Sequence, residues 1–191
     1  MEQEEYLDVE IIQKRTELLK EQHGELETGI YINGEVIEFA RKEVLDSLFV
    51  MIPVKFALML DELADVKYPF IFRPGCILTN EDLTINLNFN EYPNNLGETT
   101  MMQATENVKE ILENKQEAFD FGEVTPLNNI DGYYFDFRQN VEDGELYHML
   151  ANVKINNHFY QLTFNCLLSE HVDWKPAVVQ IWESAEYRKE E

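Results

Sequence analysis

The stretch from Ile130 to Leu168 constrains the fold most, because its residue pattern predicts three consecutive antiparallel strands. Asn156-Asn157 lies midway between two runs that alternate apolar and polar residues. A two-residue turn there gathers the apolar residues of both runs on one face, as a half-buried sheet requires. The predicted pairs are Ile155 with His158, Val153 with Tyr160, Ala151 with Leu162 and Met149 with Phe164.

The turn before this hairpin is predicted to be a three-residue loop, Glu142-Asp143-Gly144, with Gly144 in the left-handed region. A two-residue Asp143-Gly144 loop would instead set Asp136 and Arg138 against the apolar face. The longer loop places an aromatic set beside Val153, Ala151 and Met149; this set is Tyr133, Phe135 and Phe137. Tyr134 then lies on the other face, where we expect it to pack under a helix.

Charge is the unusual feature of the composition. The 191 residues, enough for one domain, include 37 Asp and Glu against 15 Lys and Arg, a net charge of −22. A field of this sign repels nucleic-acid phosphates and anionic lipids, and it attracts basic molecules. We therefore expect another protein as the partner, with a basic protein as the more specific interpretation, and neither nucleic acid nor a membrane. The sequence does not indicate the oligomeric state.

The start of the chain is acidic and lacks the basic and apolar regions of a secretory signal. The longest apolar tract, Leu48–Leu60, is interrupted by Pro53 and Lys55 and is too short to cross a bilayer. We therefore expect a soluble cytoplasmic protein.

Residues 4–22 are predicted to form a charged helix, in which Ile11, Ile12, Leu18 and Leu19 recur at a spacing of seven. The first interpretation is a helix that packs on its own domain, and the alternative is a short self-association or partner helix. We expect residues 1–28 to form an N-terminal acidic helical segment and residues 29–191 to form a single α/β/α sandwich domain.

The remaining segments favour an α+β protein, an antiparallel sheet flanked by helices. Predicted strands cover residues 35–42, 45–52, 76–79, 83–90 and 119–127, and residues 54–66 are either a short helix or an irregular crossover. Thr99 or Thr100 can cap a helix of about 18 residues. A last helix is predicted near Trp174, with Pro176 in its first turn.

Several local sequences now resemble those of one known group. They are Ile52-Pro53, Lys67-Tyr68-Pro69, Arg73-Pro74, Leu78-Thr79-Asn80-Glu81-Asp82 and Trp174-x-Pro176. In this order, over residues 34–187, the chain resembles the PsbP/Mog-like superfamily, in a version seen in uncharacterised proteins of Gram-positive bacteria. The resemblance implies an α/β/α sandwich around an antiparallel sheet. It also implies a binding or accessory subunit, and no functional residue can be carried over.

The residues that could support catalysis do not converge in the predicted register. His148 and His158 fall on opposite faces of the sheet, so they cannot share a metal ion. Cys166 pairs with Tyr147 and points into the core, where burial makes a thiol inert. Cys76 is also interpreted as structural, and whether the two cysteines are close in space stays open. The acidic pairs Asp61-Glu62, Glu81-Asp82 and Glu142-Asp143 fall in predicted turns or loops.

The sequence therefore predicts no catalytic residue, no metal ligand and no cofactor. The favoured hypothesis is a non-enzymatic protein-binding or accessory module. One alternative is an immunity or antitoxin-like protein that neutralises a basic toxin through charge complementarity. Another is a small hydrolase or ligand-binding protein with a site in the Lys67–Pro74 loop.

Overall fold

The computed structural model describes residues 2–69, 73–93, 99–115, 118–141 and 144–188. The helices are α1 (Glu2–Gln22), α2 (Asp61–Lys67), α3 (Met101–Lys115) and α4 (His171–Glu183), the last preceded by a 3₁₀ turn at Leu168–Glu170. The strands are β1 (Gly24–Glu25), β2 (Gly29–Ile32), β3 (Glu35–Ile37), β4 (Phe39–Leu45), β5 (Leu48–Pro53), β6 (Ala57–Leu58), β7 (Cys76–Thr79), β8 (Asn86–Tyr92), β9 (Ala118–Phe119), β10 (Thr125–Pro126), β11 (Asp131–Val141), β12 (Gly144–Ile155), β13 (His158–Leu167) and β14 (Glu186–Tyr187).

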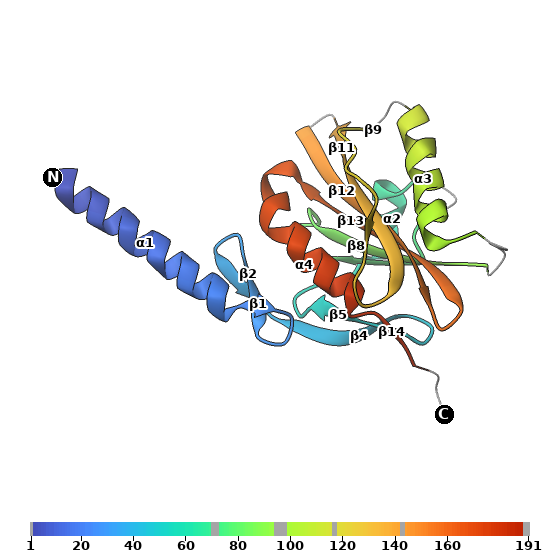
Figure 1. Ribbon diagram of the computed structural model, residues 1–191, viewed down its shortest axis with the longest axis horizontal. Helices are drawn as coiled ribbons and strands as arrows, with labels where there is room; N and C mark the ends of the chain where they lie inside the picture. Colours follow the sequence, from blue (N-terminus) through green and yellow to red (C-terminus); the bar gives the residue numbers. More distant parts are fainter. Residues whose placement is uncertain (1, 70–72, 94–98, 116–117, 142–143, 189–191) are drawn as a thin grey trace.

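A large antiparallel sheet forms the middle layer (Figure 1). Its strands follow the order β10-β11-β12-β13-β8-β7-β6, and β9 pairs with the outer part of β11. Helix α4 and a small sheet, β14-β5-β4, cover one face, while α2 and α3 lie against the other. This arrangement confirms the predicted α+β class with an antiparallel sheet flanked by helices. None of the helices in the described part of the chain combines the length and hydropathy needed to span a bilayer.

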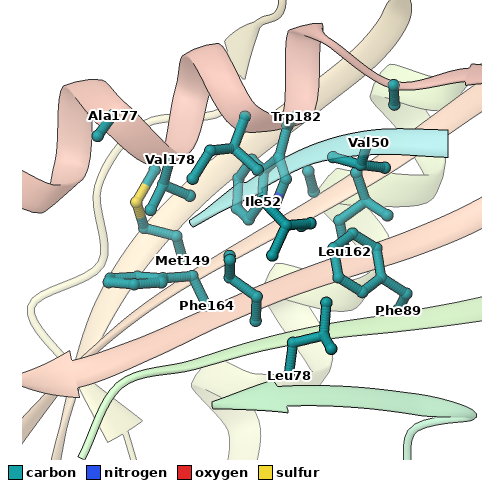
Figure 2. Packing of buried hydrophobic residues seen from close by; sticks show 14 of the residues in the cluster. Val50, Ile52, Leu78, Phe89, Met149, Leu162, Phe164, Ala177, Val178 and Trp182 are labelled. Carbon is teal, nitrogen blue, oxygen red and sulfur yellow. The ribbon is translucent and has the colours of Figure 1, made fainter. Parts of the chain in front are cut away.

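The main core lies between α4 and the large sheet (Figure 2). Trp182 and Val178 of α4 pack against Phe164 and Met149 of the sheet, and each of these four residues is 0% exposed. Ile52 of the small sheet closes the same cluster from the side. Burial of these large side chains, each contributing roughly 1.5–3 kcal/mol, ties the three layers together.

The β12–β13 hairpin has the register that the sequence predicts. All four expected pairs occur: Ile155–His158, Val153–Tyr160, Ala151–Leu162 and Met149–Phe164. Asn156 and Asn157 occupy the turn with φ of 47° and 68°. Two successive positive φ values define the turn type whose twist matches paired strands, and asparagine tolerates them better than most residues.

The predicted register between β11 and β12 is wrong by one residue. Gly144 is the first residue of β12 and pairs with Val141, so the loop is shorter than expected. Phe135 and Phe137 consequently pair with Leu150 and His148 and pack against α3. The error arises because helices cover both faces of β11, α3 on the side of Phe135 and α4 on the side of Tyr134, so alternation alone does not identify its core side.

Tyr134 and Asp136 occupy the α4 side of β11 instead. Tyr134 packs edge-on against Trp182, with ring centroids 6.2 Å apart. The expectation that Tyr134 lies under a helix is therefore confirmed. Its face is the main-core face, where the predicted register places Tyr133, Phe135 and Phe137.

Several element boundaries also differ from the prediction. Residues 119–127 form two short strands, β9 and β10, because only their ends pair with β11. Helix α4 begins at His171, directly after the 3₁₀ turn, so Pro176 lies inside the helix and not in its first turn. Asp61 and Glu62 open helix α2, where acidic side chains complement the helix dipole, and do not lie in a turn.

Helix α1 projects away from the rest of the molecule (Figure 1). Ile11 and Ile12 are each 63% exposed, and Leu18 is 49% exposed. Near the end of the helix, the Lys20 ammonium lies 3.0 Å from Asp173 of α4. The interpretation that the apolar stripe packs on its own domain is therefore wrong for Ile11, Ile12 and Leu18, whereas Leu19 is half-buried.

Candidate functional site: an acid-rimmed cleft

A cleft of about 850 Å³ opens where the β2–β3 hairpin approaches the main sheet. Its lining comes from four distant parts of the chain: Glu35–Glu38, Pro53–Phe56, Asn80–Asp82 with Ile85, and Trp174. A volume of this size falls in the range of clefts that bind ligands or short peptide segments.

Two turns hold the first wall of the cleft. Asn33 and Gly34, with φ of 48° and 93°, form a tight turn that places Glu35 opposite Ile32. The Val54 amide donates a hydrogen bond to the Glu38 carbonyl at 2.8 Å, which fastens β3 to the segment after β5. The Lys42 ammonium of β4 donates a hydrogen bond to the Phe56 carbonyl at 2.7 Å, which stabilises the same segment.

The opposite wall is a turn organised by Asn80. The Ile85 backbone amide donates a hydrogen bond to the side-chain oxygen Asn80 Oδ1 at 2.9 Å. The Asn80 backbone amide donates in return to the Ile85 carbonyl at 3.2 Å. Leu83 adopts a φ of 60°, and the Lys67 ammonium donates to its carbonyl. These bonds fix the turn, so the exposed side chains of Glu81 and Asp82 stand at its tip.

The rim of the cleft is acidic and its floor is apolar. Four exposed carboxylates, those of Glu35, Glu38, Glu81 and Asp82, face a single cation, Lys55. No described residue forms an ion pair with any of these carboxylates. The floor consists of the buried side chains of Phe56, Trp174 and Ile85, with the first two rings 5.9 Å apart. Such a surface favours a cation that carries an apolar portion.

The two candidate histidines lie on opposite faces of the sheet, as the register predicts. The His148 ring stacks on Phe137 at 4.8 Å, and burial lowers the pKa of His148 to about 4. On the other side, His158 Nδ1 lies 2.7 Å from Glu91 Oε1. Within the described residues, no group of three His, Cys, Asp or Glu side chains is arranged to hold a metal ion.

Both cysteines are free thiols buried in strands. Cys166 pairs with Tyr147, as predicted, and Cys76 lies in β7. Burial raises the pKa of Cys76 to about 11 and that of Cys166 to about 12, because the core disfavours a thiolate. Neither thiol is therefore activated as a nucleophile at neutral pH.

A buried polar row crosses the sheet on the side of α2 and α3. Paired positions on neighbouring strands give the row Thr79, Asn86, Asn165 and His148. Alternation predicts that Asn86 faces away from the main core, and it does, but the second helical layer leaves it 0% exposed. Neither amide atom of Asn86 has a hydrogen-bond partner among the described residues.

One neighbour of this row belongs to the Lys67–Pro74 loop, which the hydrolase alternative singled out. The Tyr68 hydroxyl lies 3.4 Å from Asn165 Oδ1 and 3.5 Å from Asn88 Oδ1. Arg73, at the far end of the loop, forms ion pairs with Asp61 and Asp65 of α2. The described residues of this loop thus stabilise α2 against the sheet, and the acid-rimmed cleft lies elsewhere.

Sequence reasoning missed the cleft as a site. Glu81-Asp82 was recognised as a turn, and the structure confirms that turn, but no pattern linked it to Glu35 or Trp174. The only available indication was the excess of acidic residues, which the sequence spreads over the whole chain.

Comparison with known proteins gives the fold. No protein-family model and no curated protein sequence matches this chain. Among solved structures, it is similar to cyanobacterial PsbP (CyanoP) from Synechocystis sp. PCC 6803, with a TM-score of 0.54 and 12% sequence identity over 84% of this chain and 98% of that one. It is also similar to a protein from Bacteroides thetaiotaomicron VPI-5482, with a TM-score of 0.50 and 13% identity over 79% of this chain and 49% of that one. At these identities the likeness concerns architecture alone, and the chain has a PsbP-like α+β fold.

Proposed function

We propose that this chain is a non-enzymatic protein-binding module that holds a basic segment of another protein in the acid-rimmed cleft. The observation that carries the proposal is that one cleft combines an apolar floor with four carboxylates that form no ion pair with any described residue. The buried thiols and the separated histidines offer no comparable arrangement for catalysis.

The cleft suits a segment in which Lys or Arg alternates with apolar residues. Aliphatic side chains would cover Phe56 and Ile85, while the cationic groups would reach Glu35 and Glu38 on one wall and Glu81 and its neighbour on the other. The net charge of −22 would draw such a segment from a distance and raise its association rate.

An accessory role agrees with the resemblance to the PsbP/Mog-like superfamily, and an origin in its Gram-positive branch is part of the same proposal. The immunity or antitoxin alternative uses the same chemistry, with a basic toxin as the bound protein. The two roles would differ in the identity of the partner and not in the cleft. A pull-down at low and high salt, followed by identification of the bound protein, separates them.

The test uses a fluorescent peptide in which Lys alternates with Leu or Val, and its counterpart with Glu in place of Lys. Fluorescence anisotropy should detect binding of the basic peptide only. The double variants E35Q/E38Q and E81Q/D82N should each weaken binding by about ten-fold, because each removes two charges from one wall.

The matched control is E106Q/E110Q, which removes two exposed carboxylates from α3 and leaves the cleft intact. It should change the affinity by less than about two-fold. If the control weakens binding as much as the cleft variants do, the peptide responds to net charge alone and the proposed site is wrong.

A further inference from the structure

We infer that helix α1 pairs with α1 of a second copy of this chain, in antiparallel orientation. This inference is independent of the proposed function, because the described residues that line the acid-rimmed cleft all lie outside α1. The starting observation is the exposed stripe of Ile11, Ile12 and Leu18 on a helix that projects from the molecule (Figure 1).

A helix of this kind needs a packing partner. Its 21 residues span about 31 Å, and helices in proteins gain most of their stability from the packing of an apolar face. Along the described part of α1, from Asp8 to Gln22, no side chain is buried. Covering Ile11 and Ile12 with the same residues of a second helix would supply that contact.

The charge pattern of α1 indicates the orientation of the pair. Between Glu2 and Glu10 the sequence has five acidic residues and no basic one. The second half, residues 11–22, has Lys14, Arg15 and Lys20 against Glu17 and Glu21, which leaves it a net charge of +1. An antiparallel arrangement brings the acidic half of each helix beside the basic half of the other. A parallel arrangement brings like charges together.

Repulsion between the acidic sheet-containing domains of the two copies, here called their bodies, favours the same antiparallel orientation. Each chain has a net charge of −22, and its body lies at the C-terminal end of α1. Antiparallel helices hold the bodies at opposite ends, about 30 Å apart, which exceeds the screening length of about 10 Å at 0.1 M salt. The apolar residues near the helix midpoint, Ile11 and Ile12, then lie where the two helices cross.

The first test is the mass in solution, measured by light scattering or sedimentation equilibrium from about 1 to about 100 µM. We expect the wild-type chain to approach twice its monomer mass of 22.5 kDa, and I11D/I12D to stay at 22.5 kDa. The control L58D/V66D changes two other exposed apolar residues and should remain dimeric. A wild-type monomer at all concentrations, or a dimeric I11D/I12D variant, overturns the inference.

The second test is the orientation. A spin label on Q22C, at the exposed end of α1, should give an inter-label distance on the order of 30 Å in an antiparallel pair. A parallel pair would give about 10 Å, the spacing of packed helices, and would refute the antiparallel arrangement. The two native cysteines are buried and do not compete for the label.

Discussion

The Lys175 ammonium of α4 lies 2.6 Å from Asp136 Oδ2 of β11, and the Tyr147 hydroxyl donates to the same oxygen at 2.6 Å. The Asp136 side chain is only 17% exposed, so a partly buried carboxylate joins the last helix to the sheet. Burial alone would raise the pKa of Asp136, but the hydrogen bonds from Lys175 and Tyr147 and the charge of Lys175 outweigh it and lower that pKa.

Replacing Asp136 with Asn should lower the free energy of unfolding by about 2 kcal/mol at pH 7, because hydrogen bonds to a charged group are lost. The lowered pKa adds stability that is present above the unfolded value of 3.8 and is lost as pH falls below it. Urea unfolding of both proteins should therefore show a difference at pH 7 that narrows toward pH 3. A difference that is constant with pH would contradict the ionised role of Asp136.

His148 should make the stability depend on pH in a different range. The pKa of His148 is lowered from its ordinary value of 6.5 to about 4 in the folded protein, because burial disfavours the charged ring. As pH falls from 6.5 to 4, the unfolded chain binds a proton that the folded chain excludes, so stability falls by about 3 kcal/mol at most. H148F keeps the stacking on Phe137 and should show a shallower decline in urea unfolding over this range. Equal slopes for the two proteins would contradict the prediction.

The two buried asparagines of β8 should respond oppositely to the same change. Neither side-chain amide atom of Asn86 has a hydrogen-bond partner in the described part of the chain, whereas the Asn88 side chain donates to Thr163 Oγ1 at 3.0 Å. N86L should leave the melting temperature unchanged or raise it, since an unpaired buried amide is removed. N88L should lower the free energy of unfolding by about 1–3 kcal/mol. A large loss in N86L would mean that its amide binds an additional polar group.

The main core should be sensitive to truncation within a single strand. Leu162 is 0% exposed in the middle of β13, and L162A should lower the free energy of unfolding by about 2–5 kcal/mol. Leu167, at the end of the same strand, is 41% exposed, and L167A should have an effect of less than about 1 kcal/mol. Chemical denaturation of the two variants checks the contrast, and similar losses would place the core elsewhere.

The β12–β13 pairing could be predicted because one face of the hairpin is apolar and Asn156-Asn157 admits a single turn length. The β11 pairing could not, because Phe135 is covered by α3 and Tyr134 by α4. When both faces of a strand are covered, the side-chain pattern no longer identifies its register, and only the loop length decides it.

The cleft could not be predicted for another reason. Glu35, Glu81 and Trp174 meet only because the β2–β3 hairpin, the turn before β8 and the start of α4 come together in space. Long-range proximity of this kind has no local pattern in the sequence. The apolar stripe of α1, in contrast, can be predicted from its spacing of seven. The structure was needed only to show that Ile11, Ile12 and Leu18 of this stripe are exposed.

The outermost strands of the large sheet, β10 and β6, have two residues each. So short an edge offers few unpaired backbone groups to a foreign strand, which protects a protein against edge-to-edge aggregation. The outer strands of the large sheet should therefore resist pairing with a strand of a second copy when the protein is concentrated.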